Sequence, residues 1–391
     1  MRKLHEAMQE YSIPLIVGII VALFWANISP ETYEHFIHFP LFNDVTIHFL
    51  VEDIFMVFFF ATAAVEIVES LLPGGSLNPI KRAFNPLIAT VGGVAGPVAV
   101  YLLLNMLIGD PQYTVGWGIP TATDIAIAWL VAKLVFGGGH PAIKYLLLLA
   151  IADDAIGLII IAIFYPSGAV LPQYLLLCLL GMSVALTLRK MHVNGYIWYL
   201  VLGGIPCWLG LHFANIHASL ALVLIIPFLP AVPEDVTDID DEDDERALEK
   251  FNRHWKPVVD YGLFFFGLCN AGVEFSSIGI LTLLITAALI VGKCGGIFAF
   301  GYLGAKLGFD LPKGMGRRDL AVAGIVAGVG LTVALFMCNS AFVDPVLQGS
   351  AKMGALLSIL AGPLAFAASK VLGIRRYREG EMLQPFHTNI K

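Results

Sequence analysis

Charged residues are scarce in this sequence: they fill only 14% of its 391 positions, whereas hydrophobic residues fill 58%. The mean hydropathy is +0.81. A water-soluble protein of this length has too little interior to bury so much apolar surface. The composition therefore excludes an ordinary soluble domain and predicts a protein that lies in a lipid bilayer.

Cysteine is also scarce. The five cysteines all lie inside apolar runs without metal-binding spacing, so we expect small buried side chains. No basic patch with interleaved aromatic residues indicates nucleic-acid binding. A cleavable signal peptide is not evident, because the first apolar run, from about Ser12, is long enough to stay in the membrane. We expect no cofactor, no nucleic-acid partner, and contact with membrane lipid.

One short stretch carries many of the charges. Residues 234–245 are mostly aspartate and glutamate and account for much of the formal net charge of −7. Like charges at this density repel one another and stay hydrated. We expect a flexible acidic loop at about 232–250, within a single transmembrane domain that covers residues 1–391.

Long apolar runs make up the rest of the chain. A helix that crosses a bilayer needs about 20 mostly apolar residues. This length predicts an all-α polytopic membrane protein with about twelve transmembrane helices. The divisions between 118–137 and 141–165 and between 194–210 and 212–230 are the hardest to place. The expected spans are 12–29, 51–72, 84–108, 118–137, 141–165, 172–189, 194–210, 212–230, 257–275, 280–306, 319–342 and 350–373.

Lysine and arginine segregate to one side of this arrangement. With the N-terminus inside, nearly all of them fall at cytoplasmic ends, Lys352 falls on the opposite side, and Lys293 lies within a span. Positive charge is enriched in the cytoplasmic loops of membrane proteins. We therefore expect both termini and the acidic loop in the cytoplasm.

Glycine and proline interrupt two of the predicted spans. Residues 116–124 place breakers and hydroxyls at the start of the fourth span, and residues 324–332 do the same in the eleventh. Such breaks are tolerated at membrane depth where protein or a water-filled cavity satisfies the freed backbone groups. Two breaks at matching positions predict two inverted repeats with discontinuous helices 4 and 11. Close helix packing through glycine is the alternative explanation.

Charged side chains inside spans are the most informative feature, because each is costly at the bilayer centre unless it is paired or hydrated. Asp124, Asp153, Asp154 and Lys293 lie well inside predicted spans. Adjacent aspartates on a helix point about 100° apart. One plausible division pairs Asp153 with Lys293 and leaves Asp154 facing an aqueous cavity with Asp124.

Carboxylates at this depth suit a transported cation. Sodium is a hard ion that prefers oxygen ligands, which carboxylates, the Thr123 hydroxyl, carbonyl groups and water can supply. Removal from water raises the pKa of a carboxylate toward physiological pH. Protons and sodium would then compete for the same oxygens, which is the property of an exchanger. Asp124 is also placed to neutralise positive helix ends at the breaks, and Lys293 negative ones.

The charged and broken segments resemble the NhaA family of bacterial Na⁺/H⁺ antiporters. The match runs in order from about the first predicted helix to the twelfth, and the combination of Thr-Asp, Asp-Asp and Gly-Lys is highly specific. The matching motifs are Ala122-Thr123-Asp124-Ile125-Ala126, Asp153-Asp154, Asn270-Ala271-Gly272-Val273, Gly292-Lys293 and Gly328-Val329-Gly330-Leu331-Thr332.

The resemblance implies a secondary transporter rather than an enzyme, with the inverted-repeat architecture already described for this family. It implies alternating access, electrogenic exchange of sodium or lithium for protons, and sodium export that serves pH and sodium homeostasis. Asp154 would be the main cation and proton carboxylate, Asp153 its partner in an ion pair with Lys293, and Thr123 and Asp124 would line the crossing. The expected location is the bacterial inner membrane, as a multi-pass protein that can form a homodimer.

Three further residues resemble positions linked to pH response in the family. They are His217, Glu66 and Glu69. The run from Val65 to Ser70 departs from the family pattern, because it has no basic residue where one is expected, and the acidic loop is unusually long. These departures concern the pH set-point rather than the ion site.

Two other function classes fit parts of the pattern. An intramembrane aspartyl protease also needs two aspartates on neighbouring helices. It has no use for Lys293, however, and the Gly-x-Gly-Asp run of such enzymes is not seen. A sodium-coupled solute symporter is closer in chemistry and would show solute-dependent sodium uptake without proton counterflow.

Overall fold

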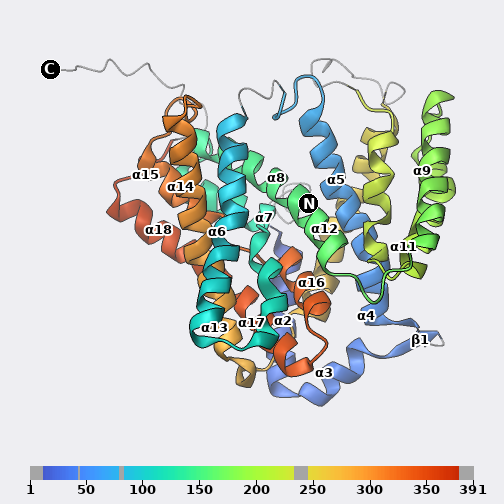
Figure 1. Ribbon diagram of the computed structural model, residues 1–391, viewed down its shortest axis with the longest axis horizontal. Coiled ribbons are helices and arrows are strands. Elements are labelled where there is room, and N and C mark those ends of the chain that lie inside the picture. Colours follow the sequence, from blue (N-terminus) through green and yellow to red (C-terminus); the bar gives the residue numbers. More distant parts are fainter. Residues whose placement is uncertain (1–11, 43–44, 79–82, 233–244, 378–391) are drawn as a thin grey trace, which may run out of the picture.

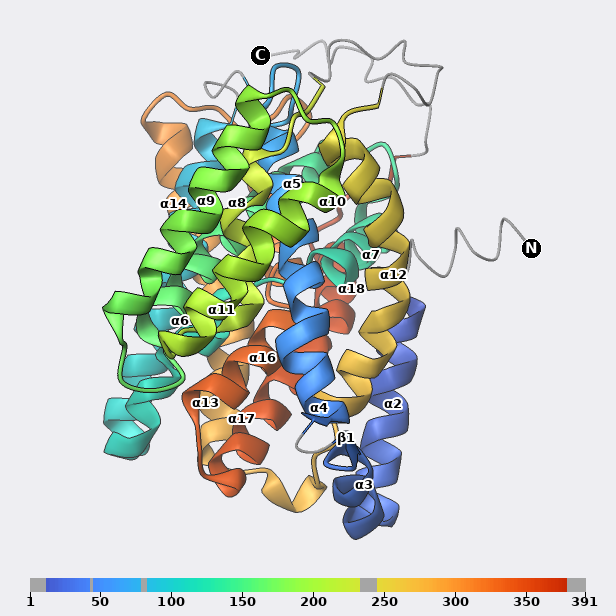
Figure 2. The same ribbon diagram turned by 90° about the vertical axis from the view of Figure 1, so that its right-hand side faces the viewer.

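The structure, a computed structural model, describes residues 12–42, 45–78, 83–232 and 245–377. The long helices run between two edges of the molecule (Figures 1 and 2). In the described part of the chain, the strands are β1 (Pro40–Phe42) and β2 (Val45–Thr46), which form a small antiparallel hairpin at one edge.

The α-helices fall into the N-terminal and C-terminal halves of the chain as follows. The N-terminal half contains α2 (Ile13–Ile28), α3 (Pro30–Ile37), α4 (Ile47–Phe49), α5 (Met56–Leu71), α6 (Phe84–Ile108), α7 (Ile125–Phe136), α8 (Pro141–Phe164) and α9 (Leu175–Lys190). The C-terminal half contains α10 (Tyr196–Trp198), α11 (Ile205–Phe213), α12 (Ala247–Asn270), α13 (Ile280–Ala287), α14 (Lys293–Lys306), α15 (Arg317–Val326), α16 (Thr332–Ala341), α17 (Pro345–Leu357) and α18 (Ala361–Val371).

Shorter helices of tighter or wider winding connect or extend these segments. The 3₁₀ segments are η3 (Pro111–Thr121), η4 (Pro172–Tyr174), η6 (Ala218–Leu224), η7 (Ile226–Phe228), η8 (Phe275–Ser277) and η10 (Ser358–Leu360). The π-helical segments are η1 (Leu50–Phe55), η5 (Tyr199–Gly204) and η9 (Ala288–Gly292). Each π segment continues directly into an α-helix.

The predicted fold class is confirmed. Within the described ranges, seven helices are long and apolar enough to cross a membrane, or eight if Pro111–Thr121 and Ile125–Phe136, bent by 60° at their junction, form one span. Shorter apolar helices cover Ile13–Ile28, Ala218–Phe228 and Thr332–Ala341. The chain is therefore a mostly helical polytopic membrane protein. The count of twelve spans and the inverted repeat stay predictions.

The predicted start of the helix after the acidic loop is wrong. α12 begins at Ala247 rather than at 257, so residues 247–250 are helical, while 233–244 lie outside the described residues. The carboxylate of Glu249 accepts hydrogen bonds from the backbone N–H groups of Arg246 and Val232 at 3.1 and 2.8 Å. The bond from Arg246 satisfies a donor at the helix start, which lets the helix begin in polar sequence, and the bond from Val232 ties this start to an earlier segment.

The predicted division between 194–210 and 212–230 is also misplaced. The helix that starts at Tyr196 continues to Phe213 and ends before Asn215, whose φ is +58°. Asparagine tolerates this left-handed conformation better than most residues, because its short side chain bonds locally to the backbone. The turn between the two segments therefore lies at Ala214 and Asn215, and the helix continues past Gly210.

α6 and α14 approach each other through glycine. A Cβ atom built on Gly296 would overlap the carbonyl oxygen of Gly92, and one built on Gly292 would lie 2.6 Å from the Cα of Pro97. Small residues spaced four apart allow two membrane helices to pack backbone against backbone. This packing fixes the position of Lys293, which follows Gly292 directly.

We expect Gly296→Ala to lower the free energy of unfolding by about 2 kcal/mol, because the new methyl group overpacks the α6 contact. Gly295→Ala is the matched control, since a Cβ atom there meets nothing within 4 Å. The control should unfold at the wild-type temperature or slightly above it, because alanine favours a helix over glycine. Thermal unfolding in detergent compares the two variants, and equal midpoints would contradict the packing argument.

Candidate ion-binding site

The two interrupted segments meet at the centre of the fold. Helical winding stops at Thr121 and resumes at Ile125, and it stops again between Val326 and Thr332. The backbone N–H of Asp124 donates a 2.8 Å hydrogen bond to the carbonyl oxygen of Val329. One donor of the first break is therefore satisfied by an acceptor of the second, and membrane-embedded backbone needs such partners.

Asp124 caps two helices at once. Its Oδ1 accepts from the backbone N–H of Ile127 at 3.1 Å, at the start of α7. Its Oδ2 accepts from the backbone N–H and the hydroxyl of Thr332 at 3.3 and 3.1 Å, at the start of α16. The N-terminus of a helix carries a partial positive charge, so one buried carboxylate stabilises both ends.

Lys293 and Thr123 form hydrogen bonds with carbonyl groups at the C-terminal ends of helices beside the breaks. The Lys293 ammonium donates to the carbonyl oxygen of Thr121, where η3 ends. The Thr123 hydroxyl lies 3.1 Å from the carbonyl oxygen of Ala327, just past the end of α15, and 2.8 Å from Asp153 Oδ2. A helix C-terminus carries partial negative charge, which the Lys293 ammonium compensates.

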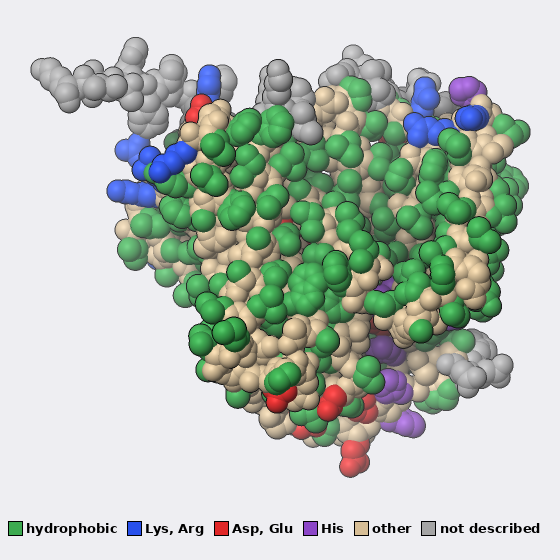
Figure 3. All heavy atoms as spheres, in the orientation of Figure 1, with side chains coloured by type: hydrophobic (Ala, Val, Ile, Leu, Met, Phe, Trp, Pro, Cys, Tyr) green, Lys and Arg blue, Asp and Glu red, His purple; other side chains and the backbone are tan. Residues whose placement is uncertain are grey.

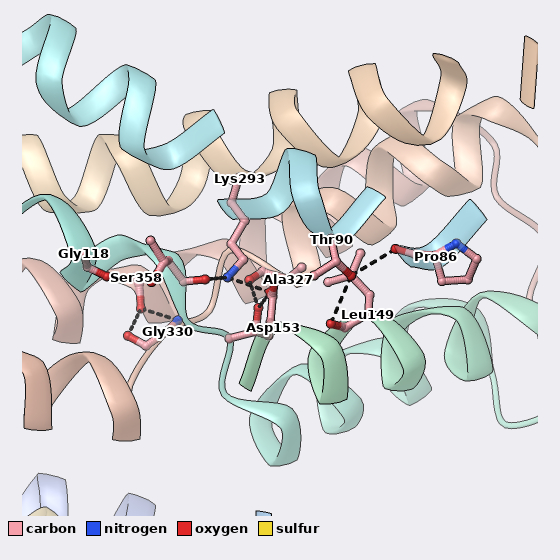
Figure 4. A network of polar contacts seen from close by, with 11 residues as sticks. Pro86, Thr90, Gly118, Leu149, Asp153, Lys293, Ala327, Gly330 and Ser358 are labelled. Atoms are coloured by element: carbon pink, nitrogen blue, oxygen red, sulfur yellow. Dashed lines mark hydrogen bonds and ion pairs between the residues drawn. The ribbon is translucent and has the colours of Figure 1, made fainter. Parts of the chain in front are cut away.

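Asp153 and Lys293 form an ion pair. Lys293 Nζ lies 2.9 Å from Asp153 Oδ2, and neither side chain has any solvent exposure. Figure 4 shows the two side chains facing each other beside Ala327. Removing one member of such a pair leaves an uncompensated buried charge, which is why buried pairs are costly to break.

Asp154 has a different environment from its neighbour. Its Oδ1 is buried without a hydrogen-bond partner among the described residues. The side chain lines a cavity of about 760 Å³ together with Thr123, Asp124 and Thr332. The adjacent aspartates therefore divide as the helix geometry allows, one held by an ion pair and one facing open space.

Charged and polar side chains of α5 and α12 also line this cavity. Glu66 and Glu69 on α5 line it, and each contacts α12: Lys256 Nζ lies 3.2 Å from Glu66 Oε1, and Asn252 Nδ2 lies 3.3 Å from Glu69 Oε1. The basic residue missing from the sequence around Glu66 is thus supplied by a distant helix. The run itself holds no basic residue, as the sequence showed, and the pH-response role of Glu66 and Glu69 stays a prediction.

His217 lies away from this cavity. Its ring packs edge-on against Phe336, with centroids 5.2 Å apart, and its Nε2 is buried without a hydrogen-bond partner in the described part of the chain. The structure thus brings Thr123, Asp124 and Asp154 to one cavity, which Glu66 and Glu69 also line, but not His217.

Two positioning residues escaped the sequence interpretation. Thr332 binds the Asp124 carboxylate, and Ser358 Oγ lies 3.1 Å from both the N–H and the carbonyl oxygen of Gly330. Thr332 closes the glycine-rich run 328–332, so its place beside a break was a usable signal. Ser358 lies in an ordinary apolar stretch, and no sequence signal marks it.

Asp124→Ala should lower the free energy of unfolding by about 2 kcal/mol, because three hydrogen-bond donors at two helix starts lose a charged acceptor. We expect slower transport and a lower unfolding temperature, with transport not abolished. The control is Asp344→Ala, which removes a cap on the single backbone N–H of Val346 in an exposed turn. The control should lower the free energy of unfolding by about 1 kcal/mol or less. Equal losses in thermal unfolding would show that Asp124 has no double role.

The chain is similar to known cation exchangers over nearly its whole length. The family model described as Na+/H+ antiporter 1 matches residues 2–369. The Na(+)/H(+) antiporter NhaA of Desulfitobacterium hafniense (strain DSM 10664 / DCB-2) is 56% identical over 382 residues, which cover 97% of this chain and 98% of the relative. The Na(+)/H(+) antiporter NhaA of Geotalea uraniireducens (strain Rf4) is 56% identical over 380 residues, which cover 96% of this chain and 98% of the relative.

A solved structure shares the fold. The sodium proton antiporter MjNhaP1 from Methanocaldococcus jannaschii superposes with a TM-score of 0.57 at 14% sequence identity, and the match covers 93% of this chain and 92% of that one. The chain therefore belongs to the Na⁺/H⁺ antiporter 1 family and is a membrane transporter.

Proposed function

We propose that this Na⁺/H⁺ antiporter binds either a proton or a sodium ion at Asp154, and that their competition for this carboxylate couples the two flows. The observation that carries the proposal is the division of the aspartate pair. Asp153 forms an ion pair with Lys293, whereas Asp154 lines a cavity, and its Oδ1 has no hydrogen-bond partner in the part of the chain that the structure describes. A carboxylate oxygen without a donor is an unfavourable buried group until a proton or a cation reaches it.

Sodium at Asp154 would be held by mixed oxygen ligands. Within the described residues, no group of three or more histidine, cysteine, aspartate or glutamate side chains is arranged to hold a metal ion. Thr123 and Thr332 line the same cavity as Asp154, so their hydroxyls can supply oxygen ligands, and water can complete the shell. Lithium, a smaller hard ion, suits the same ligands.

The Asp153–Lys293 pair supports electrogenic exchange. When sodium attracts Asp153 as a second carboxylate, Lys293 loses its counter-ion and releases its proton, because an unpaired buried charge is costly. One sodium ion then displaces two protons, so that one net charge crosses the membrane in each cycle. An inside-negative potential would drive sodium export, at about 2.3 kcal/mol per charge for each 100 mV.

Two separate cavities support alternating access. The Asp154 cavity and a second cavity of about 670 Å³, which Lys352 lines, have no residue in common. Phe336 lies on α16 between Thr332 of the first cavity and Asn339 of the second, and it packs edge-to-face on Phe60 with ring centroids 5.2 Å apart. On the face drawn in Figure 3, lysine and arginine gather along one edge, and most of the visible acidic and histidine side chains lie toward the opposite edge. The positive-inside rule then assigns the Asp154 cavity to the cytoplasmic side of a bacterial inner membrane, with both termini cytoplasmic.

The proposed exchange is tested in sealed vesicles that contain a pH dye and the purified protein. Sodium or lithium added outside vesicles with an acidic interior should release the internal protons, and faster when the imposed potential favours net charge movement. A symporter would instead need an added solute for sodium uptake and would leave the internal pH unchanged. Proton release that is absent with sodium would refute the proposal.

A further inference from the structure

The cavity on the side opposite to Asp154 has a polar inner end that the proposed exchange does not use. Asn339 of α16, Cys269 of α12 and Lys352 of α17 line it, along with residues of α3 and of the segment after α12. Lys352 is 9% exposed. A lysine this far inside a membrane protein marks a functional site more often than a structural one.

Asn339 connects this cavity to a carboxylate on η1. Its Nδ2 donates to Glu52 Oε1 at 2.9 Å and also to Asn270 Oδ1. The Oδ1 atom of the same Asn339 side chain is buried and has no hydrogen-bond partner among the described residues. Glu52 lies in a π-helical segment, a local widening that often occurs at functional sites.

The contacts of Asn339 resemble a cation site built from oxygen ligands, in which the Nδ2 atom of Asn339 occupies the position of the cation. The amide nitrogen lies between a carboxylate oxygen and an amide oxygen. Rotation of the Asn339 side-chain amide by half a turn would point its Oδ1 toward Glu52 and Asn270 in place of Nδ2. The Oδ1 atom of Asn339 and the oxygens of Glu52 and Asn270 would then surround one position. Hard cations such as sodium take this kind of ligand set, and an unsatisfied buried oxygen is expected where a ligand can bind.

We propose that Glu52, Asn270 and Asn339 form a second sodium-binding station on the exit side, and that Lys352 speeds release from it. The inference rests on the proposed exchange at Asp154, because it places this station next on the outward path. Glu52 gives the station its affinity for a cation. Lys352 lines the cavity that Asn339 also lines, and its positive charge weakens this affinity and limits the rebinding of external sodium.

α16 connects the Asp154 cavity with the proposed exit station. Its first residue, Thr332, binds Asp124 beside the Asp154 cavity, and Asn339 lies two turns further, about 10 Å along the helix. Between these residues, Phe336 contacts Phe60. Movement of α16 that separates this aromatic pair would open a path from Asp154 to the exit station.

The test measures the sodium concentration that half-saturates exchange from each side of the membrane, in everted and in right-side-out membrane vesicles. External sodium reaches the Asp154 cavity in everted vesicles and the exit cavity in right-side-out vesicles. Glu52→Gln should raise the half-saturating concentration about tenfold in right-side-out vesicles only. Lys352→Gln should lower it there, which is a change of opposite sign.

Glu34→Gln is the matched control. Glu34 lines the same cavity but is largely exposed and lies 3.4 Å from His38, so the substitution removes the same charge without touching the station. Equal effects of Glu34→Gln and Glu52→Gln would show that the change in half-saturating concentration comes from surface charge alone, and would overturn the proposal. So would an equal shift in both vesicle types, or no shift at all.

Two further readouts keep the result interpretable. If Glu52→Gln fails to accumulate in the membrane, Asn339→Asp provides the second variant, and an added carboxylate should lower the half-saturating concentration from the exit side. An Asn339→Asp protein with wild-type values would also overturn the proposal. Absence of exchange by the wild-type protein in both vesicle types would instead refute the exchange at Asp154, so that the two failures are distinct.

Discussion

Asp154→Asn is expected to abolish sodium–proton exchange, leaving no more proton release than in protein-free vesicles. Asparagine has nearly the same shape, so the cavity and the neighbouring ion pair should be preserved. It cannot bind or release a proton in the physiological range, and it lacks the charge that holds sodium. Loss of transport in a folded protein would therefore report the chemistry of this carboxylate alone.

Sodium-dependent stability provides an independent readout of the same variant. A ligand that binds the folded state stabilises it by about 2.7 kcal/mol at a concentration of 100 times its dissociation constant. Wild-type protein should therefore unfold at a higher temperature in sodium than in a large organic cation, and Asp154→Asn should not. The matched comparison is Asp153→Asn, which should impair transport strongly and keep part of this sodium effect. Normal exchange by Asp154→Asn would show that the ion binds elsewhere.

Lys293→Ala is expected to be the most destabilising single substitution at the site. It leaves the fully buried Asp153 carboxylate without its counter-ion and the carbonyl group of Thr121 without its donor. Breaking a buried ion pair by removing one partner typically costs about 3–5 kcal/mol. The variant should therefore unfold well below the wild-type temperature, and any protein that remains folded should move less charge per sodium ion.

A double variant separates the ion pair from side-chain size. Asp153→Asn combined with Lys293→Ala removes the stranded charge, so it should recover a large part of the stability that Lys293→Ala loses. Thermal unfolding of the four proteins gives the coupling energy, and currents on a supported membrane give the charge moved. An unchanged unfolding temperature for Lys293→Ala, together with unchanged currents, would argue against a buried pair in the working protein.

Much of the site could be predicted because buried charge is so costly in a membrane. A chain with 14% charged residues places very few of them at bilayer depth, and those few have to be paired, hydrated or functional. The Asp153-Asp154 pair, Asp124 and Lys293 stood out for this reason. The spacing of two adjacent aspartates on a helix also indicated that they would face different neighbours.

The sequence by itself determined the class of protein, the approximate positions of the long apolar helices and the short set of buried ionisable residues, because hydropathy and the cost of buried charge are local properties. The tertiary structure alone decided which residues meet. Thr332 binds Asp124 from 208 residues away, and the partner of Glu66 comes from a helix 190 residues further along the chain. Such contacts depend on how helices pack, and on where Gly92 and Gly296 let two of them touch, and no local pattern records that geometry.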